Sequence, residues 1–211
     1  NVDLKWINAS QSNSLNSAYI ILLAIPFTWL WTYLSKINAN PNSPFKMGLG
    51  LAFVGVGFLI FGFSSNSLNV DAQVPMIFLI LGIFVYTIGE LFLSPVGLSK
   101  VTELSPKKFV SFLMGVWFLA SFYGHFFAGQ IAQLTTISPG NESIFTQGIF
   151  KTITPMITGI EFSSLANQSE QHLQLYSYVS VFTGVGLITL FIGIIALLIS
   201  PWIKKKMGGV H

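Results

Sequence analysis

Long apolar segments separated by shorter polar ones dominate the pattern of this chain. A helix needs about 20 mostly apolar residues to cross a bilayer, and five segments come close to that length or exceed it. The predicted spans cover residues 15–34, 47–63, 74–98, 109–134 and 175–203. Because the second span is short, we expect it to stand nearly upright in the bilayer or to extend into its flanks. The stretch 135–174 is predicted to lie outside the membrane, as a short surface helix or as a loop.

Glycines in the second span fall into two sets, and each set repeats every seven residues. One set is Gly48, Gly55 and Gly62, and the other is Gly50 and Gly57. This spacing puts each set on its own helix face, and small residues let neighbouring backbones approach closely. We therefore expect the second span to be wedged between two neighbours inside a bundle.

Composition agrees with an integral membrane protein. Hydrophobic residues make up 52% of the chain and charged residues 8%, against about 25% charged residues in soluble domains. A soluble surface needs more charge than this. The chain has no cysteine, which excludes disulfide and thiol chemistry within it. Its basic residues are all lysines, scattered along the sequence, so we expect no nucleic-acid partner.

The lysines also predict an orientation. If the spans alternate in direction, eight of the ten lysines fall on one side: Lys36, Lys46, Lys100, Lys107, Lys108, Lys204, Lys205 and Lys206. Short lysine-rich loops stay cytoplasmic, so we expect the chain to start outside and end inside, in a bacterial inner membrane. An outside start without a signal peptide favours the C-terminal part of a larger protein; a small self-inserting protein is the alternative.

Glu90 is the one charged residue well inside a predicted span. A carboxylate at the centre of a membrane helix costs about 2.5–3.5 kcal/mol on insertion scales, and such groups tend to face a wet cavity on an ion or substrate path. The competing interpretation is a buried ion pair that only fixes helix packing.

The inner half of the third span combines polar side chains with a proline. Tyr86, Glu90 and Ser94 are four residues apart and share a helix face that Gly97 continues. Pro95 removes a backbone donor from the helix ladder, and free backbone at membrane depth is tolerated inside protein or beside water. This pattern predicts a lined cavity, with a break at Pro95 that serves as a hinge.

Other polar residues of the spans allow two interpretations each. Asn16 is either a helix cap or a hydrogen-bonding group at a cavity mouth. Trp117, which shares a face of the fourth span with Ser121, is either a packing residue or a cavity wall. His125 is either a proton carrier or a neutral group bonded to a neighbouring helix. No nucleophile–base set or metal-ligand spacing is present, so we expect neither an enzyme nor a metal site.

Four stretches form an ordered set of motifs: residues 89–99 with 101–102 and 104–106, residues 15–16 with 26 and 30–31, residues 45–50 with 55 and 57–59, and residues 112–119 with 128–129. Together they resemble the proton-dependent oligopeptide transporters of the major facilitator superfamily. The resemblance implies helices eight to twelve of a transporter with twelve or more spans. It therefore implies an all-α polytopic bundle of the major facilitator type.

The resemblance also implies roles for particular residues. Glu90 would line the central cavity and engage the amino end of a peptide, and Asn16 would contact the peptide as well. Ser94 and Trp117 would line the pocket. The family usually has proline after the asparagine, where this chain has Ser17. The first seven helices, which would supply the basic residues and the Glu-x-x-Glu-Arg proton motif, are not in this sequence.

The function implied is proton-coupled symport of di- and tripeptides by alternating access. Pro95 and Gly97 would belong to the inner gate, Tyr86 and Ser121 would line the cavity, and the proton would be the coupling ion with no other cofactor. The expected partners are the peptide, the lipid bilayer and the missing N-terminal helices. The alternatives are another solute on this scaffold, such as nitrate or a drug, and a non-transporting subunit or peptide sensor.

Overall fold

A computed structural model of the chain describes residues 9–67, 74–135, 148–159 and 170–206. The elements are α1 (Ala9–Lys36), α2 (Ser43–Phe63), the 3₁₀ helix η1 (Ser64–Ser67), α3 (Met76–Leu104), α4 (Val110–Gln133), α5 (Gly148–Thr158) and α7 (Glu170–Lys206). Five of them, α1, α2, α3, α4 and α7, are long and apolar enough to cross a membrane. The predicted all-α bundle of membrane helices is therefore confirmed.

Helix α2 is the centre of the bundle, with α7 along one side and α3 along the other. The first glycine set, at 48, 55 and 62, faces α7, and the second, at 50 and 57, faces α3. A Cβ atom on Gly55 would lie 2.6 Å from the Leu190 backbone nitrogen, and one on Gly50 would lie 2.9 Å from the Gly89 carbonyl oxygen. The predicted wedging of this span between two neighbours is thus confirmed.

Helix α2 begins at Ser43, before the predicted start of its span, because Asn42 caps it. The Asn42 Oδ1 atom accepts a hydrogen bond from the Phe45 backbone nitrogen at 2.8 Å. The same oxygen accepts from the Ser200 hydroxyl of α7 at 2.7 Å. One side chain therefore starts α2 and ties its end to α7.

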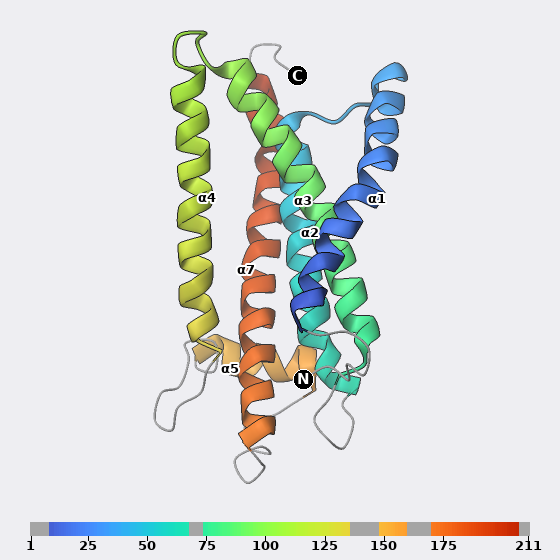
Figure 1. Cartoon of the computed structure of the whole chain (residues 1–211), viewed down its shortest axis with the longest axis vertical. Helices are drawn as coiled ribbons and strands as arrows, with labels where there is room; N and C mark the ends of the chain where they lie inside the picture. The colour runs from blue at the N-terminus through green and yellow to red at the C-terminus, as the bar shows by residue number, and fades with distance from the viewer. Residues whose placement is uncertain (1–8, 68–73, 136–147, 160–169, 207–211) are drawn as a thin grey trace.

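Helices α1 and α4 are more loosely attached and stand at opposite sides of the bundle (Figure 1). Each of them packs mainly against α3, and none of the residues of α4 is buried. Helix α3 runs through Pro95 as one α-helix. The predicted break at this proline is therefore wrong, because a long helix held along α2 tolerates the loss of one backbone donor.

The two ends of the bundle differ in charge. The eight lysines that predict the inner side gather at the end where α1, α3 and α7 finish, at the top of Figure 1. There the Lys46 ammonium lies 4.1 Å from the centroid of the Trp31 ring. Helix α5 crosses the opposite end (Figure 1), so the stretch 135–174 does contain a short helix.

Helix α5 is attached to the bundle through buried hydroxyl groups. Its Thr154 and Thr158 are fully buried, and the Ser65 hydroxyl donates to the Thr158 carbonyl oxygen at 3.2 Å. Residues 136–147 and 160–169 of the predicted stretch 135–174 lie outside the described residues.

We predict that Gly55→Ala lowers the free energy of unfolding by about 1–3 kcal/mol, the range for overpacked sites. The added methyl group would meet the Leu190 backbone, which cannot rotate away as a side chain can. Thermal unfolding of the purified protein in detergent measures the change. Gly124→Ala is the matched control, since no atom lies within 4 Å of a Cβ atom placed there. Equal midpoints for the two variants would contradict the packing of α2 on α7.

Candidate functional site

Polar side chains of α1 and α3 meet inside the otherwise apolar bundle. The Asn16 Nδ2 atom donates a hydrogen bond to Glu90 Oε2 at 3.1 Å. The Thr87 hydroxyl donates to Asn16 Oδ1 at 2.6 Å and also approaches the Ile83 carbonyl oxygen at 2.7 Å. The structure therefore brings together Asn16 and Glu90, two of the predicted site residues, although they are 74 positions apart in sequence.

Asn16 lies within α1, which begins at Ala9. The interpretation of Asn16 as a helix cap is therefore wrong, because its side-chain amide forms hydrogen bonds with Glu90 and Thr87 of α3. Glu90 is half-buried, and within the described ranges no lysine forms an ion pair with it. Within the described residues, the structure therefore does not support the hypothesis that Glu90 forms a purely structural ion pair.

Aromatic contacts hold α1 against α3 on either side of this polar pair. Tyr19 packs edge-on against Phe84, with ring centroids 5.4 Å apart. Further along the two helices, Phe27 and Trp31 both pack edge-on against Phe92, each with centroids 5.3 Å apart. Such pairs add about 0.5–1.5 kcal/mol beyond the area they bury. They keep the Asn16 amide within reach of Glu90.

Tyr86 adds a third polar group beside the carboxylate. It lies one turn before Glu90 on the same face of α3. Its ring packs edge-on against Phe58 of α2, with centroids 5.8 Å apart. Tyr86 therefore links the polar pair to the rigid α2–α3 contact.

The other predicted residues lie elsewhere on α3 and α4. The Trp117 ring packs directly on Gly97, so closely that a Cβ atom on Gly97 would overlap it. These two residues and Lys100 line a cavity of about 440 Å³ between the helices. Ser94 and Pro95 are exposed on α3.

On α4, Ser121 and His125 are also exposed, and the Ser121 hydroxyl donates to the Trp117 carbonyl oxygen at 3.4 Å. The predicted residues thus form two groups in the structure. One comprises Asn16, Tyr86 and Glu90, and the other comprises Gly97 and Trp117.

Thr87 is a member of the site that sequence reasoning missed. It is fully buried and lies three positions before Glu90, which puts both residues on the same side of α3. A threonine inside an apolar span also bonds readily to its own helix backbone, and so its type alone points to no site. Its spacing from Glu90 was the available signal.

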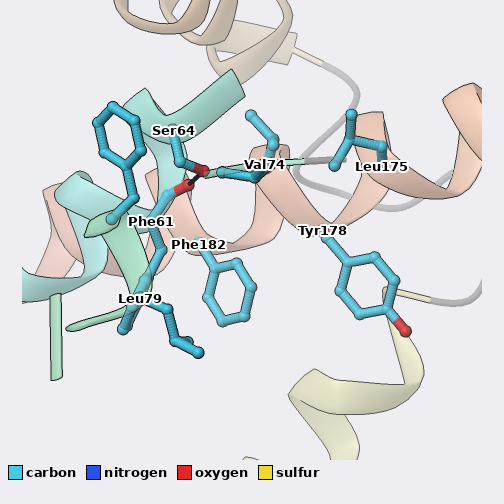
Figure 2. A pocket seen from close by; sticks show the side chains of 9 residues that line it. Phe61, Ser64, Val74, Leu79, Leu175, Tyr178 and Phe182 are labelled. Atoms are coloured by element: carbon cyan, nitrogen blue, oxygen red, sulfur yellow. Dashed lines mark hydrogen bonds between the residues drawn. The ribbon is translucent and has the colours of Figure 1, made fainter. Parts of the chain in front are cut away.

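A second cavity, of about 260 Å³, lies at the α5 end of the bundle and contains none of the predicted residues. Figure 2 shows Phe61 and Ser64 of the α2–η1 segment, Val74 and Leu79 near the start of α3, and Leu175, Tyr178 and Phe182 of α7 around it. The Ser64 hydroxyl donates to the Phe61 carbonyl oxygen at 2.6 Å. With its serine already bonded and no charged side chain in its lining, this cavity suits an apolar filling.

The sequence pattern of the POT family matches residues 2–147. The chain is 30% identical over 204 residues to the uncharacterized transporter YclF of Bacillus subtilis, which covers 97% of this chain and 33% of that protein. It is 30% identical over 197 residues to a di-/tripeptide transporter of Lactococcus lactis, covering 93% of this chain and 32% of that protein.

A solved structure agrees with these matches. The crystal structure of a peptide transporter POT in complex with sulfate superposes with a TM-score of 0.68 at 28% identity, and the match covers 97% of this chain and 34% of that one. The chain therefore spans about a third of the length of the relatives that it matches.

We predict that Gly97→Ala is destabilising by about 1–3 kcal/mol because its methyl group displaces the Trp117 ring. Replacing Trp117 by the smaller phenylalanine in the same protein should recover part of that loss. The measurement is a double-mutant cycle of thermal unfolding with Gly97→Ala, Trp117→Phe and the pair. We expect a coupling of about 0.5–3 kcal/mol, as found for residues in contact. Strictly additive effects would show that the two residues do not touch.

Proposed function

The chain belongs to the POT family, and from that premise we propose that it forms the peptide-binding C-terminal part of a proton-coupled di- and tripeptide symporter. The family match and the solved structure confirm the resemblance seen in the motifs, together with the polytopic fold of the major facilitator type. The relatives are transporters and not enzymes.

The observation that carries the proposal is the hydrogen bond between Asn16 and Glu90. A carboxylate inside a membrane bundle is costly and marks an ion or substrate path. Asn16 donates to Oε2 of Glu90, and no side chain among the described residues donates to the other carboxylate oxygen, which leaves that oxygen open to a cation. A peptide ammonium is a compact cation with three donors, and a carboxylate with an amide beside it matches that chemistry.

The remaining predicted residues fit a pocket that tolerates many side chains. A peptide carrier has to bind both termini of the peptide and leave space between them for different side chains. We assign Trp117 and Ser94 to the lining of the pocket between the two termini of the peptide, with Tyr86 and Ser121 as further lining residues. The groups that hold the peptide carboxylate would come from helices outside this chain, as would the proton motif implied by the family resemblance.

Coupling would arise from an exchange of partners at Glu90. In the proposed cycle, Glu90 pairs with a lysine of the other half of the transporter until a peptide ammonium replaces that lysine. Loss of the pair loosens one gate, and the two halves rock about the midplane site. The α3–α4 hairpin would form the inner gate, with Pro95 and Gly97 on its α3 arm and the lysine-rich end in the cytoplasm.

We predict that Glu90→Gln lowers proton-driven dialanine uptake at least about tenfold, since a hydrogen bond to a charged group contributes about 1.5–3 kcal/mol. The measurement is uptake of labelled dialanine into proteoliposomes under an inward proton gradient, with the whole transporter that contains this chain. Glu103→Gln is the matched control, because Glu103 is exposed and pairs with Lys100 of its own helix.

Three outcomes separate the possibilities. Uptake that depends on the gradient and is lost only with Glu90→Gln supports both the substrate and the assigned carboxylate. Uptake that survives Glu90→Gln would overturn the role of this residue. A folded transporter that takes up no dialanine would contradict the peptide substrate and favour another solute or a sensor.

A further inference from the structure

We propose that Thr87 is a positioning residue of the peptide site, whose hydroxyl turns the amide of Asn16 so that its NH₂ group meets Glu90. This inference rests on the proposed function, because it assigns a role within the same site. Thr87 itself would not touch the peptide. It would act through Asn16 and decide which face of the carboxylate is left for the ammonium.

The polarity of the three groups carries the argument. An asparagine side chain has a donor end and an acceptor end, and an ionised carboxylate only accepts. One orientation of Asn16 therefore attracts Glu90, and the reverse orientation places two oxygens against each other. In the structure the attractive orientation is present, with Nδ2 of Asn16 3.1 Å from Glu90 Oε2.

The acceptor end of Asn16 must then be satisfied on its other side. Among the described residues, the Thr87 hydroxyl is the donor that reaches it, at 2.6 Å from Asn16 Oδ1. A polar atom left without a partner in a buried place is costly. The hydroxyl thus stabilises the orientation that Glu90 requires.

Burial and helix geometry fix the hydroxyl in place. Thr87 has no exposed surface, and its Oγ1 atom lies 2.7 Å from the Ile83 carbonyl oxygen one turn earlier in α3. A threonine has few side-chain rotamers on a helix. Thr87 and Glu90 stand on one rigid helix, and Asn16 is the part that they orient from α1.

The charged and titratable groups on the helices around this site leave the assignment intact. From α1 they are Tyr19, Tyr33 and Lys36, from α2 Lys46, from α4 Tyr123 and His125, and from α3 itself Tyr86, Lys100 and Glu103. Tyr86 lies one turn before Glu90, and Lys100 and Glu103 pair with each other further along α3. Lys46 lies over the Trp31 ring, and His125 is exposed on α4.

The test compares Thr87→Val, which keeps the branched shape, with Thr87→Ser, which keeps the hydroxyl. Initial rates of dialanine uptake by the whole transporter give KM and kcat for each, with thermal unfolding as a check on folding. We expect Thr87→Val to raise KM about fivefold, the effect of one net hydrogen bond, with kcat changed less than about twofold. Thr87→Ser should restore KM to within about twofold of wild type.

Thr28→Val is the matched control. The Thr28 Oγ1 atom lies 2.8 Å from the Ala24 carbonyl oxygen one turn earlier, as the Thr87 Oγ1 atom lies near the Ile83 carbonyl oxygen, but Thr28 supports no site residue. We expect wild-type KM and kcat for this variant. If Thr87→Val does not fold, Thr87→Ala removes the same hydroxyl without the second methyl group and replaces it in the comparison.

The outcomes separate this inference from the function on which it rests. A wild-type transporter without dialanine uptake would sink the proposed function. An active wild type whose KM is unchanged in Thr87→Val would overturn the positioning role alone. So would a Thr87→Ser variant as impaired as Thr87→Val, or a loss confined to thermal stability.

Discussion

A carboxylate inside an apolar helix bundle requires donors within reach, and the contact between α1 and α3 at Glu90 is built around that requirement. Placing the charge there costs about 2.5–3.5 kcal/mol, and a hydrogen bond to a charged group returns about 1.5–3 kcal/mol. The hydrogen bond from the Asn16 amide can therefore offset most of the free-energy cost of placing the charge in the bundle. Because α1 packs mainly against α3, this polar contact and the aromatic pairs beside it determine where α1 lies.

The rest of the bundle divides into a rigid frame and a looser flank. Glycines on both faces of α2 let α3 and α7 approach to backbone contact, and closely packed interfaces of this kind resist deformation. Helix α4 has no buried residue and packs mainly against α3.

Periodicity was sufficient to predict the framework. Apolar length predicts the five membrane helices, and the seven-residue glycine repeats of α2 predict its two packed faces, because both features depend on local helix geometry. The Asn42 cap that starts α2 before its apolar run was not predicted, since its second partner, Ser200, is distant in sequence. The break predicted at Pro95 was wrong because contacts along α3 outweigh the loss of one backbone donor.

The site was harder to predict, because it depends on which helices meet. Spacing puts Tyr86 beside Glu90, but nothing local to Asn16 indicates that its amide faces α3 across 74 positions. Only the resemblance to a transporter family placed these residues in one site. The role of Thr87 was not predicted because a threonine in a helix usually bonds to its own backbone. Its hydrogen bond to Asn16 exists only in the folded bundle.

The most direct measurement is competition for the site by dialanine and by dialanine whose amino group is acetylated. The central claim is that Glu90, oriented by Asn16, recognises the amino end of a peptide as a cation. In the wild-type transporter, the account predicts that acetylated dialanine binds at least about tenfold more weakly than dialanine. In Glu90→Gln, the difference in affinity between the two peptides should be smaller. Equal competition by the two peptides in the wild type would contradict it.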